Sequence, residues 1–307
     1  MKNGEFLLRT GLTSSVLEGY ESKELIKPKR DKNGYREYTD EDVRIAIEYK
    51  NSLNFRRTYH VDKNYFDLVD SSDKAYWLGF LWGDGTVGDD SVTLALCTKD
   101  IEHLDKFKKC IKSNHPIKIF KHNVTRFNRT GGEYCRVCIY SKDMVNVIHN
   151  NYGIFKGRED FSKTLENVPK EFHRDLLRGL IDSDGSVFIK DRYNISLSLI
   201  ASDSVLDFYE SFINDITGNI KKYKRSIHRN GYAGVKTIQL GGAQRIFFIL
   251  HSIYQNSNIY LGRKYSKYLW LLDDVKVFCK DIEKGNGPKN LSIVKYKKVL
   301  LDTGVKV

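Results

Sequence analysis

The sequence predicts an α+β protein in which two similar halves follow a small N-terminal helical unit. Two segments of similar composition, Trp77–Gly85 and Leu177–Gly185, each end in Asp-Gly and lie 100 positions apart. An alternating run of apolar residues follows each segment, which indicates strands. The first 50 residues lack this pattern and contain two short helical segments and an Asn-Gly hairpin. These observations define the fold class.

The composition excludes some classes of protein. The chain has 307 residues, with 51 Lys or Arg against 39 Asp or Glu, and a formal net charge of +12. The mean hydropathy is −0.48, and no apolar run is long enough to span a membrane. The N-terminus has no apolar signal region, so we expect a cytoplasmic protein. Five cysteines spread over the chain favour a reducing compartment over a disulfide framework.

Residues 1–52 predict a helix-turn-helix with a basic hairpin. Residues around Leu7 form a short helix, Gly11 a tight turn, and a second helix starts at a Thr13 or Ser14 cap. An Asn-Gly hairpin with basic arms follows over residues 25–38. A further helix begins at residues 39–42, whose acids suit the positive end of a helix dipole. This order is typical of winged DNA-binding units.

Several ordered residues of this unit carry a family resemblance: Thr10-Gly11-Leu12, Tyr20-Glu21, Leu25-Ile26-Lys27-Pro28, Arg30, Asn33-Gly34-Tyr35-Arg36-Glu37-Tyr38 and Asp42-Val43. They resemble the DNA-binding unit of MerR-type regulators over about residues 5–48. The long dimerising helix and the effector domain of that family do not follow, so inducer sensing is not carried over. The candidate DNA contacts in this unit are Ser14, Ser15, Lys29, Arg30 and Arg36.

Residues 53–70 are polar and mixed, and we interpret them as a linker. The duplication then spans residues 71–166 and 167–283. Residues 92–96 lead to residues 100–107 in the first copy, as residues 195–199 lead to residues 203–208 in the second. Each copy is predicted as helix, two strands, helix, two strands and helix. We assign no role to the C-terminal tail, residues 284–307.

Two basic stretches lie at equivalent places in the two copies. Eight basic residues and no acid occur from Lys106 to Arg129, and five more occur from Lys221 to Arg229. Both stretches end in hairpin sequences, so part of the charge lies on paired strands. A basic and aromatic sheet face that occurs twice is typical of a saddle that binds duplex DNA. The alternative is two solvated faces without a ligand.

The two repeated segments place small residues four apart on a helix face. These residues are Ala75, Gly79 and Gly83 in the first copy, and Gly179 and Ser183 in the second. Such faces let two helix backbones approach closely. We therefore expect these helices to pack against each other.

Each helix is expected to end next to a carboxylate. Gly85 and Gly185 predict left-handed helix ends, which places Asp84 and Asp184 at the negative ends of two helix dipoles. Bringing these ends together is unfavourable unless a cation lies between them. Hard oxygen ligands that leave room for water and phosphate suit Mg²⁺, which can activate a water and stabilise a leaving alkoxide.

These two segments resemble the LAGLIDADG motifs of homing endonucleases, in the two-motif, single-chain form, over about residues 65–275. The resemblance implies two pseudo-symmetric repeats that form a DNA-binding saddle. It also implies hydrolysis of double-stranded DNA at a specific site, dependent on Mg²⁺ or another divalent cation such as Mn²⁺. A monomer, bound to the nucleoid and associated with introns or other mobile elements, would follow. The alternative is a non-cleaving transcription regulator or an intron maturase of the same fold.

The resemblance transfers roles residue by residue. The metal-binding catalytic acids are Asp84 and Asp184, with Gly83 and Ser183 as further metal positions. Lys264 and Arg158 are the basic residues that would polarise the phosphate or order waters. In the first repeat Lys156 is an alternative to Arg158, and Glu159 aligns with Lys264. Trp82 replaces the first acid of the motif, which we expect to be tolerated. Ala201 cannot order water as Thr98 can, so unequal nicking of the two strands is expected.

The remaining candidate DNA contacts lie on the predicted strands and hairpins. On residues 134–140, Tyr134 and Arg136 are expected on the outward face, while Val137 and Ile139 face the helices. Phosphate contacts would give affinity, and side chains on the outward face would contact bases. The candidates are Lys118, Lys121, Arg126, Arg129, Tyr134, Arg136, Lys190, Arg192, Lys221, Lys222, Lys224, Arg225 and Arg229.

Overall fold

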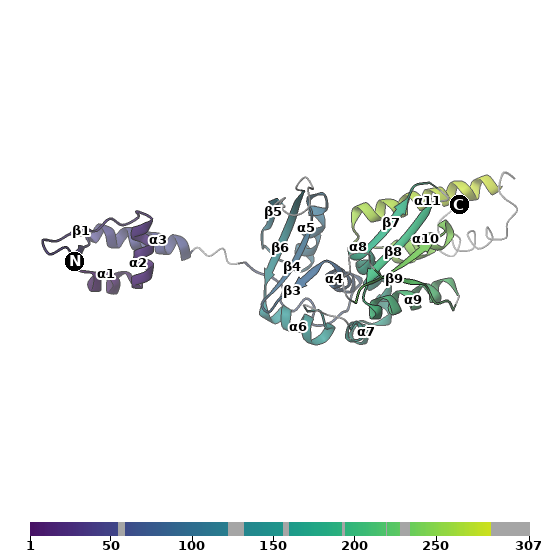
Figure 1. Cartoon of the computed structure of the whole chain (residues 1–307), viewed down its shortest axis with the longest axis horizontal. Helices are drawn as coiled ribbons and strands as arrows, with labels where there is room; N and C mark the ends of the chain where they lie inside the picture. Colours follow the sequence, from purple (N-terminus) through teal and green to yellow (C-terminus); the bar gives the residue numbers. More distant parts are fainter. Residues whose placement is uncertain are drawn as a thin grey trace. The chain divides into compact units, whose positions relative to one another are not determined.

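The chain forms two compact units, Met1–Tyr59 and His60–Val307, in a computed structural model (Figure 1). The structure describes residues 1–54, 59–121, 132–155, 160–191, 194–218, 220–227 and 234–283. Within these ranges no helix combines the length and the apolar character needed to cross a bilayer.

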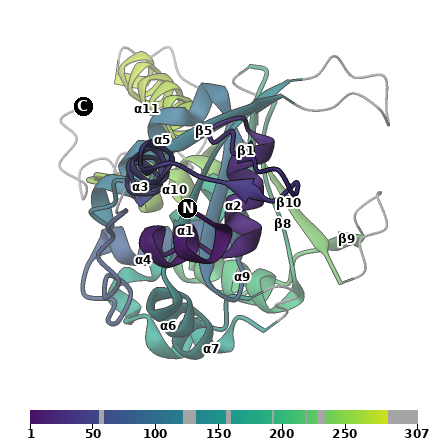
Figure 2. The same ribbon diagram turned by 90° about the vertical axis from the view of Figure 1, so that its left-hand side faces the viewer.

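The first unit has the predicted helix-turn-helix and hairpin, drawn in purple to dark blue in Figure 2. Its elements are α1 (Asn3–Thr10), α2 (Ser14–Ser22), β1 (Lys29–Arg30), β2 (Arg36–Glu37) and α3 (Asp40–Asn54). Gly11 ends α1 in the left-handed region, with φ of 61°. Thr39 and Asp42 cap α3 reciprocally, because each side chain accepts a hydrogen bond from the other residue's backbone N–H.

A small apolar core holds this unit together. It contains Phe6, Leu17, Tyr20, Ile26, Tyr38, Val43 and Ala46. The rings of Phe6 and Tyr38 stack with their centroids 4.4 Å apart, which joins α1 to the end of the hairpin. The hairpin is thereby fixed to the helix-turn-helix.

The second unit confirms the duplicated α+β architecture. The first copy contains α4 (Ser72–Gly83), β3 (Gly85–Val87), β4 (Ser91–Cys97), α5 (Ile101–Cys110), β5 (Ile117–Lys121), β6 (Glu133–Tyr140) and α6 (Lys142–Tyr152), followed by α7 (Ser162–Asn167). The second contains α8 (His173–Asp184), β7 (Gly185–Ile189), β8 (Ile195–Ala201), α9 (Asp203–Thr217), β9 (Arg225–Ile227), β10 (Lys236–Gly241), α10 (Ala243–Tyr254) and α11 (Gly262–Glu283). Short 3₁₀ turns precede α5 and α8.

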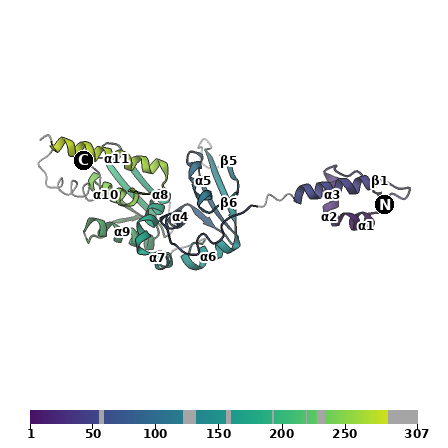
Figure 3. The same ribbon diagram turned by 180° about the vertical axis from the view of Figure 1, so that it is seen from behind.

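The two sheets are antiparallel and have the same strand order, β3-β4-β6-β5 and β7-β8-β10-β9. They lie on either side of α4 and α8 (Figures 1 and 3). Alternate residues are buried along the strands, as shown by Val92 and Leu94 on β4 and by Leu197 and Leu199 on β8. Each sheet therefore packs one face on the core and leaves the other face open.

Helices α4 and α8 cross with their backbones in contact. A Cβ atom on Gly79 would lie 2.1 Å from the carbonyl oxygen of Leu176, and one on Gly179 would lie 2.1 Å from that of Tyr76. No side chain fits at either position. The close approach expected from the small residues is thus present, and it joins the two copies through their repeated segments.

The expected left-handed helix ends at Gly85 and Gly185 are wrong. Gly185 is extended, with φ of −78° and ψ of 154°, and neither glycine has a positive φ. These positions exclude a side chain because a Cβ would lie 2.4 Å from Leu81 O or 2.5 Å from Ile181 O. The glycines let the chain turn from the helix into the first strand without a clash.

The predicted linker is longer than the structure supports. Tyr65, Phe66 and Val69 are buried in the core of the second unit. The hydroxyl of Tyr152 donates a hydrogen bond to Phe66 O at 2.8 Å. The later part of residues 53–70 therefore belongs to this unit, since three apolar side chains at close spacing are enough to anchor it.

We predict that Gly79→Ala destabilises the second unit by about 3 kcal/mol or more, because a methyl group there requires the two backbones to separate. Urea unfolding followed by circular dichroism measures the change. Gly262→Ala is the matched control, since a Cβ there meets no atom within 4 Å. Equal stability of the two variants would contradict the close crossing.

Candidate active site and nucleic-acid interface

The ends of α4 and α8, which carry the two predicted catalytic aspartates, lie against each other. Asp84 caps α4, and Asp184 is the last residue of α8. A Cβ on Gly83 would lie 2.1 Å from Ser183 Oγ and 2.6 Å from Asp184 Oδ2. The carboxylate of Asp184 therefore lies against the residue that immediately precedes Asp84. Asp84 is half-buried and Asp184 is exposed, so the junction is open on one side.

Charges of both signs surround Asp84. Burial raises the pKa of its carboxyl group, the positive charges of Lys264 and Arg263 oppose this, and Asp100 adds to it. Arg263 donates a hydrogen bond to Asp100 at 3.0 Å. Burial disfavours the charged form of Asp84. A cation beside the carboxylate would favour that form, because opposite charges attract.

Lys264 contacts the α8 side of the same junction through its buried ammonium group. Its ammonium donates to Ile181 O and Asp182 O at 2.6 Å and to Ser183 O at 3.2 Å. The side chain is 2% exposed, and burial lowers its pKa to about 8. Because it points into the carbonyl end of α8, its contribution is to offset the negative end of that helix.

The candidate ligands differ in what they offer to a cation. Ser183 Oγ donates to Gly179 O and Leu180 O, and its carbonyl accepts from Lys264, so both oxygens of Ser183 are engaged. An oxygen that takes part in one hydrogen bond keeps a second lone pair, so Ser183 stays a candidate ligand beside Asp84, Asp184 and the Gly83 carbonyl.

The donor set at the junction suits a partly hydrated hard cation. Within the described ranges, no group of three or more His, Cys, Asp or Glu could hold a metal ion. Two carboxylates and a carbonyl leave several coordination positions for water and phosphate oxygens, which is how Mg²⁺ is commonly bound. The residues present fit such an ion but would not enclose it.

A buried acid that the sequence analysis missed organises the second half of the site. Asp182 accepts hydrogen bonds from the hydroxyls of Tyr76 and Tyr254 and from the backbone N–H of Leu261. These partners lie on α4, at the end of α10 and just before α11. Asp182 thus fixes the start of α11, which carries Lys264. The signal in the sequence was the first acid of the second motif, two residues before Asp184.

The first half is built differently at the equivalent position. Trp82 takes the place of Asp182, and its indole N–H donates to Thr164 Oγ1 at 2.7 Å. Thr164 is on α7, which extends the predicted helix pattern of the first copy. The replacement of the first motif acid is thus accommodated by a hydrogen bond to a neighbouring helix.

The open face of the first sheet combines a cation with aromatic rings. Arg136 and Tyr134 lie on this face, while Val137 and Ile139 are buried, as the alternation predicted. The guanidinium of Arg136 lies 4.5 Å from the centroid of the Phe120 ring, which stacks on Tyr134 at 5.2 Å. Lys118 is exposed and lies directly opposite Arg136 in the register of β5 and β6.

The other predicted DNA contacts have different outcomes. Lys121, Lys190, Lys221, Lys222 and Lys224 are exposed. Arg225 is not available as predicted, because it pairs with Asp203 at 2.7 Å and with Asp207 on α9, and it lies opposite the buried Ile238. The remaining candidates lie outside the described residues: Arg126, Arg129, Arg158, Arg192 and Arg229. Lys156 and Glu159 lie outside them as well.

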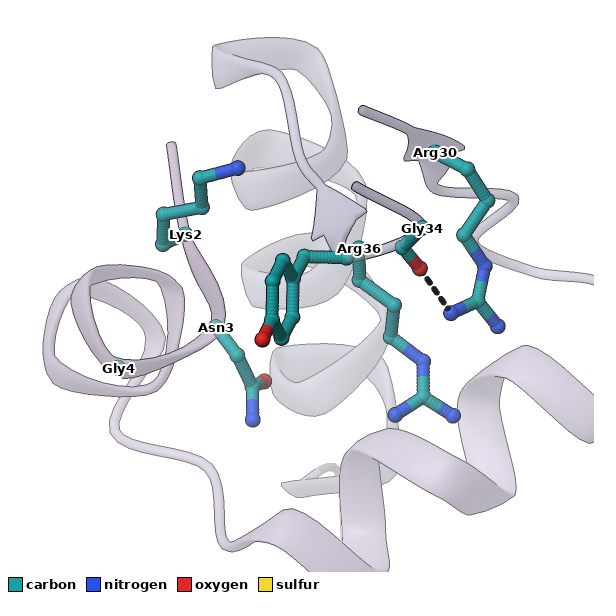
Figure 4. Close-up of a pocket in the computed structure, with 7 residues that line it drawn as sticks. Lys2, Asn3, Gly4, Arg30, Gly34 and Arg36 are labelled. Atoms are coloured by element: carbon teal, nitrogen blue, oxygen red, sulfur yellow. Dashed lines mark hydrogen bonds between the residues drawn. The ribbon is translucent and has the colours of Figure 1, made fainter. Parts of the chain in front are cut away.

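The first unit presents a second basic surface (Figure 4). Arg30 and Arg36 line a shallow cavity of about 460 Å³ together with Lys2, Asn3, Gly4, Gly34 and Tyr35. Arg30 donates to Gly34 O at 2.9 Å, and Arg36 pairs with Glu21 at 3.1 Å. Lys29 is exposed, as are Ser14 and Ser15 at the start of α2.

A match to a protein-family model agrees with the extent of the first unit. Residues 1–51 match the model of the MerR HTH family regulatory proteins, so the first unit is a MerR-type helix-turn-helix. No curated protein sequence matches the chain.

Solved structures similar to this chain include meganucleases. I-SmaMI bound to uncleaveable DNA is 11% identical, with a TM-score of 0.42 over 76% of this chain and 96% of that chain. The LAGLIDADG meganuclease I-CpaMI bound to uncleaved DNA is 10% identical, with a TM-score of 0.41 over 75% and 97%. The homing endonuclease I-WcaI bound to its DNA recognition sequence is 9% identical, with a TM-score of 0.46 over 62% and 85%. I-SmaMI has also been solved on an uncleaved target with calcium ions.

We predict that Asp182→Ala destabilises the second unit by about 3 kcal/mol, because it removes the acceptor of the buried Tyr254 hydroxyl and of the Leu261 N–H and leaves the Tyr76 hydroxyl with His103 alone. Urea unfolding measures the change. Trp82→Phe, which removes one hydrogen bond at the equivalent position, should cost about 1 kcal/mol. A larger loss in Trp82→Phe than in Asp182→Ala would contradict the central position of Asp182.

Proposed function

We propose that this chain is a site-specific endonuclease of the homing type that hydrolyses phosphodiester bonds in double-stranded DNA. The observation that supports it is the meeting of Asp84 and Asp184, from two copies of one motif, at the ends of two helices in backbone contact. Carboxylates carried by two adjoining helix ends favour a cation beside them. The repeated motif and the basic open face of the first sheet also support the proposal.

Each of these residues would have its own role in such a reaction. Asp84 and Asp184, with the Gly83 carbonyl, would hold Mg²⁺ or Mn²⁺. When bound, the ion activates water and stabilises the leaving oxygen. Lys264 offsets the negative end of α8, so the site keeps a favourable charge balance for a phosphate. Arg136, Lys118 and the exposed lysines hold the duplex.

The MerR-type unit would extend the bound DNA or tether the enzyme to it. The exposed start of α2 and the cluster of Arg30 and Arg36 are suited to contacts with bases and phosphates. Because both catalytic helices come from one chain, a monomer is sufficient for cleavage. An association with the nucleoid, and with an intron or another mobile element, belongs to the same proposal.

A DNA-binding regulator that does not cut is the second candidate. The match of residues 1–51 to a family of regulatory proteins favours it. Cleavage assays separate the two candidates, since a regulator would bind the same DNA without hydrolysing it.

We predict that Asp84→Asn and Asp184→Asn each reduce Mg²⁺-dependent cleavage of the target by about 100-fold or more, because each removes a charged ligand of the ion. Binding to the same DNA should change by less than about threefold, since the site holds little of the DNA-binding surface. Gel assays of cleavage and fluorescence anisotropy of binding give the two values. Asp89→Asn, in an exposed turn of the same repeat, is the control. Full activity in either active-site variant would rule out this site.

We predict that deletion of residues 1–52 weakens target binding by about 100-fold, because linked binding units raise each other's effective concentration. The cleavage rate at saturating DNA should stay within about threefold, since the second unit has its own core and holds both aspartates. Single-turnover kinetics over a range of protein concentrations separate the two quantities. Loss of the rate at saturation would show that the first unit acts in the chemistry.

A further inference from the structure

Lys264 has no hydrogen-bond donor left for a substrate. An ammonium group has three N–H donors, and the carbonyl oxygens of Ile181, Asp182 and Ser183 each accept one hydrogen bond from it. The residue is also buried in the second unit. Lys264 therefore stabilises the end of α8, and it cannot bind a phosphate oxygen without giving up one of these contacts.

The cation that precedes it in the chain is placed differently. Arg263 lies in the first turn of α11, and its side chain is 56% exposed. Its Nε donates a hydrogen bond to the carboxylate of Asp100 at 3.0 Å. The four N–H groups on its two Nη atoms have no acceptor among the described residues. Arg263 thus keeps the pair of donors with which a guanidinium binds a phosphate.

The acid that holds Arg263 comes from the other copy of the fold. Asp100 ends the 3₁₀ turn that follows β4 in the first copy, whereas α11 belongs to the second. A second contact joins the same two regions. Lys106 on α5 donates to Tyr260 O at 3.2 Å, and its ammonium lies 4.7 Å from the centroid of the Tyr260 ring. The start of α11 is therefore held against the first copy by two contacts.

These contacts place Arg263 beside the junction of α4 and α8. The next residue, Lys264, reaches the last turn of α8. Burial raises the pKa of the Asp84 carboxyl group, and the positive charges of Lys264 and Arg263 oppose this rise. Because the interaction between charges weakens with distance, this effect requires Arg263 to lie near Asp84. A phosphate that approaches the two motif aspartates would therefore meet the open Nη groups of Arg263.

We propose that Arg263 is a catalytic residue that donates hydrogen bonds to the phosphate to be cleaved, that Asp100 is the positioning residue that orients it, and that Lys264 does not touch the substrate. The inference rests on the proposed function, because it takes duplex DNA as the ligand at the junction. The role of Arg263 is electrostatic. A guanidinium keeps its protons, so it stabilises negative charge on the phosphate oxygens and transfers no proton.

The first test counts phosphate contacts through the salt dependence of DNA binding, in EDTA. The probe is the pool of duplexes that the unaltered full chain retains from a randomised library, and fluorescence anisotropy measures the affinity. Arg263→Gln should lower the affinity about threefold and reduce the slope of log affinity against log salt by about one phosphate contact. Lys264→Met should leave this slope unchanged while it lowers the midpoint of urea unfolding. Lys264→Gln replaces it if the Met variant does not fold.

The second test is single-turnover cleavage of the most abundant duplex of that pool, at saturating DNA with Mg²⁺. Arg263→Gln should reduce the rate about 100-fold. Arg263→Lys should recover part of this loss, because it restores the charge without the paired donors. Asp100→Asn should reduce the rate about tenfold. Adding Asp100→Asn to Arg263→Gln should cause no further loss, since Asp100 acts through Arg263.

Arg174→Gln is the matched control for the removal of an arginine. Arg174 is partly exposed and pairs with Asp175 at 3.6 Å, and it lies at the opposite end of α8 from Asp184, about 15 Å along the helix. Its replacement should change neither the slope nor the rate. An unchanged slope or an unchanged rate in Arg263→Gln would overturn the inference, as would a reduced slope in the Lys264 variant.

The inference and the nuclease proposal can fail separately. If the unaltered chain with Mg²⁺ cuts no DNA but Arg263→Gln loses one phosphate contact, the nuclease proposal fails and Arg263 remains a phosphate-binding residue. If the unaltered chain cuts DNA and Arg263→Gln keeps both the slope and the rate, the nuclease proposal stands and the inference fails.

Discussion

The contact between α4 and α8 determines most of what the second unit can do. Where Gly79 and Gly179 meet the opposite backbone, no side chain separates the two helices. Only this spacing lets the residues at the helix ends approach each other. A separation of a few ångströms would place Asp84 and Asp184 in different environments, each with its own solvent shell. The site is thus a consequence of helix packing, and its carboxylates contribute little to the fold.

The duplication did not produce two equal halves. In the second copy a buried acid, Asp182, links three helices and fixes the start of α11, from which Lys264 reaches the end of α8. In the first copy Trp82 contacts Thr164 instead. The same asymmetry recurs on the open sheet faces. Arg136 lies between Ala95 and Lys118 in the first sheet, and Thr237 lies between Ile200 and Ser226 at the equivalent place in the second. The two halves therefore place different side chains at equivalent positions of similar backbones.

Much of this could be predicted from sequence because it depends on local pattern. Small residues four apart indicated the helix crossing, and alternation on residues 134–140 indicated which side chains face outward. The left-handed ends at Gly85 and Gly185 were wrong, since a glycine can be required by steric contact as well as by φ. The direction of the Arg225 side chain could not be foreseen, because it depends on acids from α9 that the sheet register places beside it. The partners of Asp182 come from three distant segments, and no local pattern indicates that they meet.

The exposure of Asp184 has an evolutionary consequence. Its side chain is open to solvent, so the core offers no resistance to its replacement, whereas Gly79 and Gly179 allow no other residue. Under the proposed function, a descendant that lost cutting would still need the glycines, whereas its acids would be free to change. The residue after Ser183 would then separate chains that cut DNA from chains that only bind it.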